Sequence, residues 1–201
     1  MNANDSPTVI ISELKETMRR AHFPAEDSIR AHWFSGYAAT FFGAQDDCRF
    51  ARGSITQRAI KEYLGRRGPL TLQHDRAVII GRAVSLELAP AGLWLQGLLC
   101  NEAEDAWPEI QMGRLCGLSI NFARDPSGDL KFSQQGDRLV PEVSAILEIA
   151  VCGRPSDIHC LITPGKHPPQ DLGTIGDEWA RLQCRGREKK YLQAVKLLAG
   201  K

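Results

Sequence analysis

The sequence lacks any long apolar run. None of its uncharged stretches approaches the roughly 18 residues that a membrane-spanning helix needs. Residues 1–6 also lack the basic and apolar blocks of a signal peptide. We therefore expect a soluble protein that stays in the cytoplasm and has no contact with a membrane.

Paired cysteines are missing as well. The six cysteines are widely spaced without a Cys-x-x-Cys pair, which is typical of reduced, small hydrophobic residues and not of a disulfide framework. They are Cys48, Cys100, Cys116, Cys152, Cys160 and Cys184. A zinc site from Cys152, His159 and Cys160 is an alternative, although zinc sites normally show tighter paired spacing. We expect no metal and no other cofactor.

An excess of charge of either sign is also absent. The 25 Lys and Arg residues against 24 Asp and Glu give a formal net charge of +1, so bulk electrostatics gives no reason to expect a nucleic-acid partner. The exception is local, because seven basic residues face three acidic ones within 177–201. Either a solvated helix face or a tail that docks on an acidic surface would explain this local excess.

The length of 201 residues suits one domain with appendages. Residues 1–27 form an N-terminal arm with an amphipathic segment at 9–18, residues 28–163 form the main domain, and 164–201 hold a Pro-rich linker and a C-terminal helical tail.

Within the main domain, short strands alternate with two helices. Patterning predicts strands at about 29–42, 69–74, 77–88, 93–100 and 138–152, and a hairpin turn at 125–128. It also predicts helices at 54–64, begun by Ser54 as N-cap, and at 102–112. The expected fold is a β-rich α+β fold, a closed or nearly closed β-barrel wrapped by helices.

A further strand, at 116–123, separates two unlike faces. The apolar face consists of Cys116, Leu118, Ile120 and Phe122, and the opposite face consists of Gly117, Ser119, Asn121 and Ala123. The second face is small and polar, so it either meets solvent or forms the floor of a groove. Ser119 is the one hydroxyl on that face.

Two other segments carry possible partners for this serine. His74 ends the short apolar strand at 69–74, and because it has the parity of two core leucines it could equally be a core histidine. Glu148 interrupts the apolar run at 145–151, on the face opposite Leu147, Ile149 and Val151. A lone carboxylate in such a strand is costly unless it is paired, and an imidazole is its natural partner.

With His74, Ser119 and Glu148 in this order, the chain resembles the prohead maturation proteases of tailed phages, a serine peptidase family whose fold is similar to that of the herpesvirus assemblins. The resemblance covers roughly residues 29–163. It rests on five segments, at 35–42, 72–75 with 80–81, 91–97, 117–120, and 147–151 ahead of Pro155. One departure is Asn121, which stands where members commonly have glycine.

The resemblance implies a serine endopeptidase, a hydrolase with a Ser-His-Glu type triad that needs no cofactor. Ser119 would be the nucleophile, His74 its base and Glu148 the anion behind the imidazole. Glu142 opens a similar Glu-Val-Ser segment and is the alternative to Glu148. The loop at 152–154 is the predicted source of the oxyanion donors.

The resemblance also implies partners and a place of action. The expected substrates are the major capsid protein and the scaffold, together with the enzyme's own appendages, and a homodimer is left open. The expected location is inside the procapsid, in the cytoplasm of the infected bacterium, without membrane or specific nucleic acid. The alternatives are a non-catalytic barrel that serves as a capsid-assembly or interaction module, and a metal hydrolase that uses His159 and cysteines.

Overall fold

The computed structural model describes residues 7–41, 44–45, 48–124, 131–132, 138–140 and 142–165. The chain divides into two units, Met1–Pro168 and Pro169–Lys201, and every described residue belongs to the first. The predicted turn at 125–128, the C-terminal helical tail, most of the linker and Cys184 lie outside the described residues.

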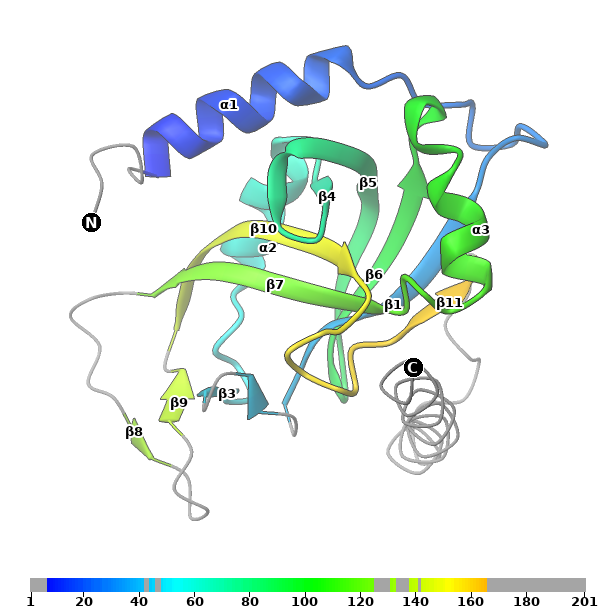
Figure 1. Cartoon of the computed structure of the whole chain (residues 1–201). Helices are drawn as coiled ribbons and strands as arrows, with labels where there is room; N and C mark the ends of the chain where they lie inside the picture. The colour runs from blue at the N-terminus through cyan, green and yellow to red at the C-terminus, as the bar shows by residue number, and fades with distance from the viewer. Residues whose placement is uncertain are drawn as a thin grey trace, which may run out of the picture. The chain divides into compact units, whose positions relative to one another are not determined.

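Seven strands form one curled sheet around the core (Figure 1). Its order is β11-β1-β6-β5-β4-β10-β7, antiparallel except for the parallel pair β4–β10. The bounds are β1 (Trp33–Thr40), β4 (Pro69–Leu72), β5 (Asp75–Ala89), β6 (Gly92–Leu99), β7 (Gly117–Arg124), β10 (Val143–Cys152) and β11 (Ile162–Pro164). A second, small sheet has the order β2 (Ala44–Gln45), β3 (Cys48–Phe50), β9 (Arg138–Val140), β8 (Lys131–Phe132).

The seven-stranded sheet curls without closing into a barrel. In the described part of the chain its two ends meet through a single bridge between Gly117 and Leu161, beside a hydrogen bond from Leu118 N to Cys160 O of 2.8 Å. β11 has three residues, too few to continue a ladder along β7. The predicted β-rich α+β class is confirmed. The predicted closed or nearly closed barrel wrapped by helices is not what forms, because the sheet stays open as a curled half-barrel and the described helices are few.

The helices are α1 (Pro7–Arg20), α2 (Gln57–Gly65), η2 (Asn101–Ala103) and α3 (Ala106–Gln111). The prediction of Ser54 as N-cap of α2 is wrong by two residues, since Thr56 accepts the capping hydrogen bond from Ala59 N at 3.1 Å. Ser54 is held outside the helix because its carbonyl accepts a 2.8 Å hydrogen bond from Val143 N at the start of β10.

The amphipathic segment predicted at 9–18 lies within α1, which packs on β5. Leu14 and Met18 are buried against Ile79 in a small cluster of their own, separate from the main core. Just after the helix, Asn101 N donates a 2.8 Å hydrogen bond to His22 O. The N-terminal segment is therefore fastened to the body at both the helix and the connection that follows it.

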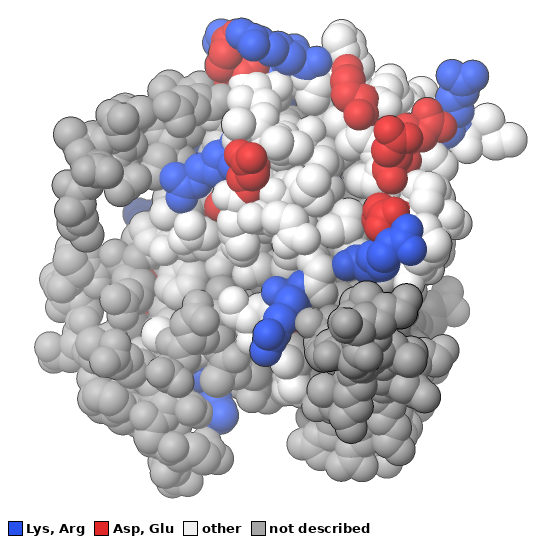
Figure 2. All heavy atoms as spheres, viewed as in Figure 1, with Lys and Arg blue, Asp and Glu red and all other residues white. Residues whose placement is uncertain are grey.

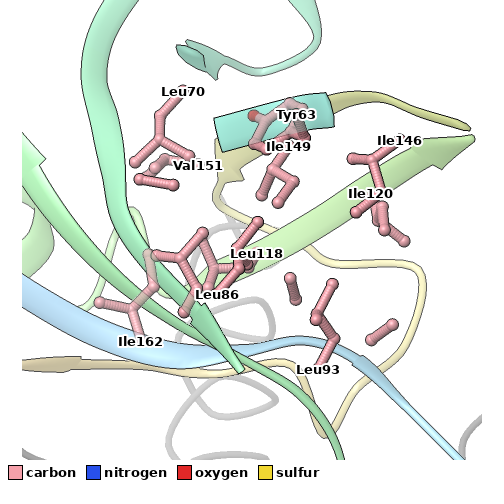
Figure 3. Close-up of a cluster of buried hydrophobic side chains, with 14 of the residues drawn as sticks. Tyr63, Leu70, Leu86, Leu93, Leu118, Ile120, Ile146, Ile149, Val151 and Ile162 are labelled. Atoms are coloured by element: carbon pink, nitrogen blue, oxygen red, sulfur yellow. The ribbon is translucent and has the colours of Figure 1, made fainter. Parts of the chain in front are cut away.

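The main core fills the inside of the curled sheet, and Figure 3 shows part of it. Leu118 and Ile120 of β7 point into this cluster, which confirms the alternation predicted for that strand. Ser119 is on the other face, as expected. Burial of the apolar side chains fixes the register of β7, because a slip of one residue would exchange the two faces.

β10 carries a β-bulge just before Glu148. Ile146 pairs with Phe122 and Glu148 pairs with Asn121, so Leu147 is an additional residue without an opposite partner. The core face of β10 is therefore Ile146, Ile149 and Val151, and the prediction that Leu147 belongs to it is wrong. Bulges of this kind redirect the side chains that follow them, and here the bulge places Glu148 away from the core face.

Charges of both signs alternate on the surface in Figure 2. Arg19 and Arg20 both contact Glu16 at 3.2 Å, and Arg114 pairs with Glu109. No helix among the described residues is long and apolar enough to cross a bilayer.

None of the cysteines in the described ranges belongs to a disulfide bond. Burial raises the pKa of Cys100 to about 11 and that of Cys152 to about 12. These two thiols stay protonated at neutral pH and behave as small hydrophobic side chains.

Candidate active site

Ser119 and Glu148 lie on two adjacent strands of the sheet, β7 and β10. Ser119 of β7 lies opposite Ala150 of β10, and Ala150 lies opposite Thr71 of β4. Because β10 lies between β7 and β4, Ser119 is two strands away from β4. Each strand is about 4.8 Å from the next. Glu148 precedes Ala150 by two residues and shares its face of β10. The sheet register thus brings Ser119 and Glu148 to the same face.

The Glu148 carboxylate is 1% exposed and meets three side chains. Thr71 donates a hydrogen bond from Oγ1 to Glu148 Oε1. His74 Nδ1 lies 3.5 Å from Oε2, and Arg76 Nε lies 3.6 Å from the same oxygen. The structure therefore brings His74 and Glu148 together as an ion pair once the imidazole is protonated.

His74 is not at the end of a strand, as the sequence suggested, but in a two-residue turn. β4 ends at Leu72, which pairs with Asp75, and the residues between them, Gln73 and His74, have φ of 53° and 64°. Left-handed conformations at both positions define the tight hairpin turn that favours Asn and Gly. A hydrogen bond of 3.0 Å from Gln73 N to Val151 O ties this turn to β10.

The strained turn gives His74 its position. Residues other than glycine adopt a positive φ at a steric cost, and such strain gathers at functional sites. In this turn the imidazole leaves the row of core leucines, with 42% of the side chain exposed. It can then contact Glu148 through Nδ1 and leave Nε2 for another group.

Ser119 is nearly buried, at 4% exposure. Its Oγ is inaccessible to solvent and has no hydrogen-bond partner among the residues that the structure describes. The structure thus pairs His74 with Glu148 but leaves the serine hydroxyl without a contact to either. In substrate-free proteases such hydrogen bonds are often long and form only with substrate.

The two remaining predictions from sequence concern Glu142 and the loop at 152–154. Glu142 is exposed, immediately before β10 begins. The loop follows β10 beside the start of β7, because Cys152 pairs with Gly117 and Cys116 Sγ lies 3.1 Å from Gly153 O. The loop therefore lies next to the serine strand, and its role as oxyanion donor stays a prediction.

The residues of the metal alternative have other contacts. His159 Nδ1 lies 3.0 Å from Asp157 Oδ1, and Cys152 Sγ lies 3.6 Å from Gly117 O. Among the described ranges, no three His, Cys, Asp or Glu residues are grouped so as to hold a metal ion.

Sequence reasoning missed Thr71 and Arg76. Thr71 lies between two leucines of a short strand, a position that looks like ordinary strand patterning. Arg76 follows a polar turn, where an arginine is unremarkable on a solvated surface. Neither residue carries a sequence signal, because both reach Glu148 only through the pairing of strands that are about 75 residues apart along the chain.

A sequence model of the caudovirus prohead serine protease family matches residues 19–161. The chain belongs to this family. The matched segment contains His74, Ser119 and Glu148 as well as Thr71 and Arg76. The resemblance stated from the sequence is thereby confirmed, and this prohead protease family is one of hydrolases that act as serine peptidases. No curated protein sequence matches the chain.

The similar solved structures include herpesvirus proteases. The protease of Kaposi's sarcoma herpesvirus, in complex with a hexapeptide phosphonate inhibitor, matches with a TM-score of 0.43 and 13% identity over 68% of this chain and 66% of that one. The varicella-zoster virus protease matches with a TM-score of 0.40 and 13% identity over 69% and 65%. The matched part thus spans just under two thirds of either viral protease.

Proposed function

We propose that this chain is a serine endopeptidase of phage capsid maturation that uses Ser119, His74 and Glu148. The observation that supports the assignment is the 3.5 Å contact between His74 Nδ1 and the buried Glu148 carboxylate, on the face that carries Ser119. Membership in the prohead serine protease family supports the reaction class.

The mechanism follows from which nitrogen of His74 faces which residue. Nδ1 faces Glu148, so Nε2 accepts the proton of Ser119 Oγ while this oxygen attacks the substrate carbonyl. The imidazolium then gives the proton to the departing amine, which leaves an acyl-enzyme. His74 next takes a proton from water, which attacks the acyl carbon, and the imidazolium returns this proton to Ser119 Oγ as the ester bond breaks, so that the acid product leaves and both residues are regenerated. Backbone N–H groups of the loop at 152–154 are the proposed donors to the oxyanion.

Glu148 is the better candidate than Glu142 for the third position. Glu148 is buried and contacts the imidazole, whereas Glu142 is exposed before the strand begins. A buried carboxylate next to a histidine stabilises the imidazolium far more than an exposed and solvated one.

The proposed substrates are the major capsid protein and the scaffold, cleaved inside the procapsid. An extended peptide that adds alongside β7, beyond the bridge between Gly117 and Leu161, would bring its backbone to Ser119, since β7 is the last strand in the order of the sheet. We also propose self-cleavage ahead of Pro24 and within 164–173, the two regions that the sequence predicts as an arm and a linker outside the main domain. Mass spectrometry of stored wild type should show shortening that a Ser119→Ala form lacks.

The buried Ser119 hydroxyl is the one observation that favours the alternative, a non-catalytic assembly module. A nucleophile must reach its substrate, and Ser119 Oγ is covered in this structure. Labelling with a small fluorophosphonate separates the two functions, because the reagent modifies only an activated and reachable serine.

The decisive experiment combines proteolysis and labelling. Wild type, Ser119→Ala, His74→Ala and their double mutant are incubated with candidate capsid and scaffold proteins, and the fragments are weighed. We expect the three variants to lose nearly the same activity, because a nucleophile and its base act as a unit. A matched control is Ser54→Ala, since Ser54 is also buried and its hydroxyl has no hydrogen-bond partner in the part of the chain that the structure describes. Absence of cleavage and labelling in wild type would refute the protease assignment.

A further inference from the structure

Glu148 raises a problem of charge compensation. A carboxylate that is 1% exposed needs a cation or several donors close by to remain ionised. If His74 were its sole cationic partner, burial of the anion would favour the protonated imidazolium. A protonated imidazole cannot accept the proton of Ser119, so such an arrangement would weaken the base that it is meant to support.

Arg76 supplies a second cation. Its Nε lies 3.6 Å from Glu148 Oε2, the oxygen that His74 Nδ1 approaches to 3.5 Å. Arginine keeps its charge at every pH in the working range. Both distances exceed those of good hydrogen bonds, so Oε2 is shared between the two groups and neither one holds it alone.

The other elements packed against β10 bring no further cation to this oxygen among the described contacts. β7 presents the neutral Asn121 opposite Glu148. From α2, Tyr63 stays neutral because burial raises its pKa well above the ordinary value, and the Arg66 guanidinium donates to the carbonyl of Ile146. Asp75 accepts a 2.9 Å hydrogen bond from Ala77 N on its own strand.

We propose that Arg76 is a positioning residue that provides permanent countercharge to Glu148 and so limits how strongly this carboxylate stabilises the His74 imidazolium, which favours the role of His74 as the base. This inference rests on the proposed triad. With Arg76 in place, the carboxylate is compensated before catalysis begins. The imidazolium that forms during attack then shares the oriented Glu148 carboxylate with Arg76. It therefore passes its proton readily to the leaving group.

The test removes the charge and keeps the fold. Arg76→Gln should move the acidic limb of the kcat/KM profile to higher pH by about half a unit or more, and Arg76→Met, a second neutral variant, should do the same. Without the guanidinium, the Glu148 carboxylate stabilises the His74 imidazolium more strongly. Arg76→Lys keeps a cation and should retain the wild-type limb. Thermal melting checks that each variant is folded.

Arg82 is the matched control. It lies on the same strand, pairs with Glu26 at 2.9 Å, and has 31% side-chain exposure against 29% for Arg76. Arg82→Gln removes the same charge from β5 without touching Glu148, so the acidic limb should stay in place. An equal displacement in Arg82→Gln would mean that only the overall charge matters, and the proposal would be wrong.

A second measurement does not depend on turnover. The imidazole signals of His74, assigned by comparison with His74→Ala, are followed by NMR against pH in wild type and in Arg76→Gln. A midpoint that rises in the variant supports the coupling even if no proteolysis is found, in which case the proposed function fails and the coupling stands. An unchanged midpoint and an unchanged acidic limb would overturn the role of Arg76.

Discussion

Thr71 and Glu148 are joined across the parallel strands β4 and β10 by a hydrogen bond from the threonine hydroxyl to Oε1. Both residues are buried, at 0% and 1% exposure. This bond fixes the rotamer of the carboxylate and leaves Oε2 to face His74 and Arg76. Thr71 is therefore the residue that aims the buried anion.

Replacing Thr71 by valine keeps the shape and removes the donor. We expect kcat to fall by about tenfold or more with little change in KM, because a hydrogen bond to a charged group contributes about 1.5 to 3 kcal/mol. Thr71→Ser keeps the hydroxyl and should recover most of the rate. Steady-state kinetics on a peptide substrate checks both variants, and equal rates for Val and Ser would show that the hydroxyl has no orienting role.

Ser119→Ala should leave the protein as stable as wild type or more stable. Its buried hydroxyl has no hydrogen-bond partner among the described residues, so it contributes a desolvation cost of about 1 to 3 kcal/mol that alanine removes. Ser54→Ala should behave alike in urea unfolding, since its hydroxyl has the same environment. Only Ser119→Ala should lose proteolysis, and a clear drop in its unfolding free energy would contradict the burial described for Ser119.

Glu148→Gln should depress turnover by about a hundredfold or more, by analogy with other triads. The amide keeps the size of the side chain and loses the anion behind His74. Glu142→Gln should have little effect, because Glu142 is exposed. Turnover and melting temperature are measured together, and a reversed ranking in well-folded variants would move the third position to Glu142 while Ser119 and His74 stand.

Asp157 should make stability depend on pH in the acid range. Burial alone would raise its pKa, but hydrogen bonds from His159 and Thr40 more than offset this and hold the pKa below the ordinary 3.8. The folded pKa is depressed, so the stabilisation is complete above pH 3.8 and is lost as pH falls through the folded value. Urea unfolding of Asp157→Asn should show a flatter dependence in this window than wild type.

The exposed residue Asp105 gives the control for this experiment. Asp105→Asn should keep the acid dependence of wild type, because Asp105 is exposed and its side chain makes no capping hydrogen bond at the start of α3. If Asp157→Asn kept the same slope as wild type, the hydrogen bonds at Asp157 would not favour the ionised form.

The sequence by itself determined the local elements and the faces of the strands. Alternation predicted that Leu118 and Ile120 enter the core and that Ser119 does not, because side chains on a strand alternate and burial selects one face. The segment of α1 and most strands were predicted for similar local reasons. The resemblance that named the family also rested on local segments, and the family match confirms it.

Local patterns failed where a distant contact decided the outcome. Ser54 was predicted as a helix cap, but its bond to Val143 places it before the helix. Leu147 was assigned to the core face, but a bulge set by pairing with β7 removes it. His74 was placed on a strand, but β4 and β5 meet in a tight turn that includes it.

Only the tertiary structure decided what surrounds Glu148. Thr71 and Arg76 are separated from it by more than 70 positions in the sequence, and no local pattern in the chain indicates either contact. The parallel pairing of β4 with β10 brings Thr71 beside Glu148, and the turn after β4 returns Arg76 to the same carboxylate. Strand pairing between distant segments depends on the packing of the whole core, whereas the two faces of a strand without a bulge at these positions, such as β7 at Leu118 and Ser119, follow from its own alternation.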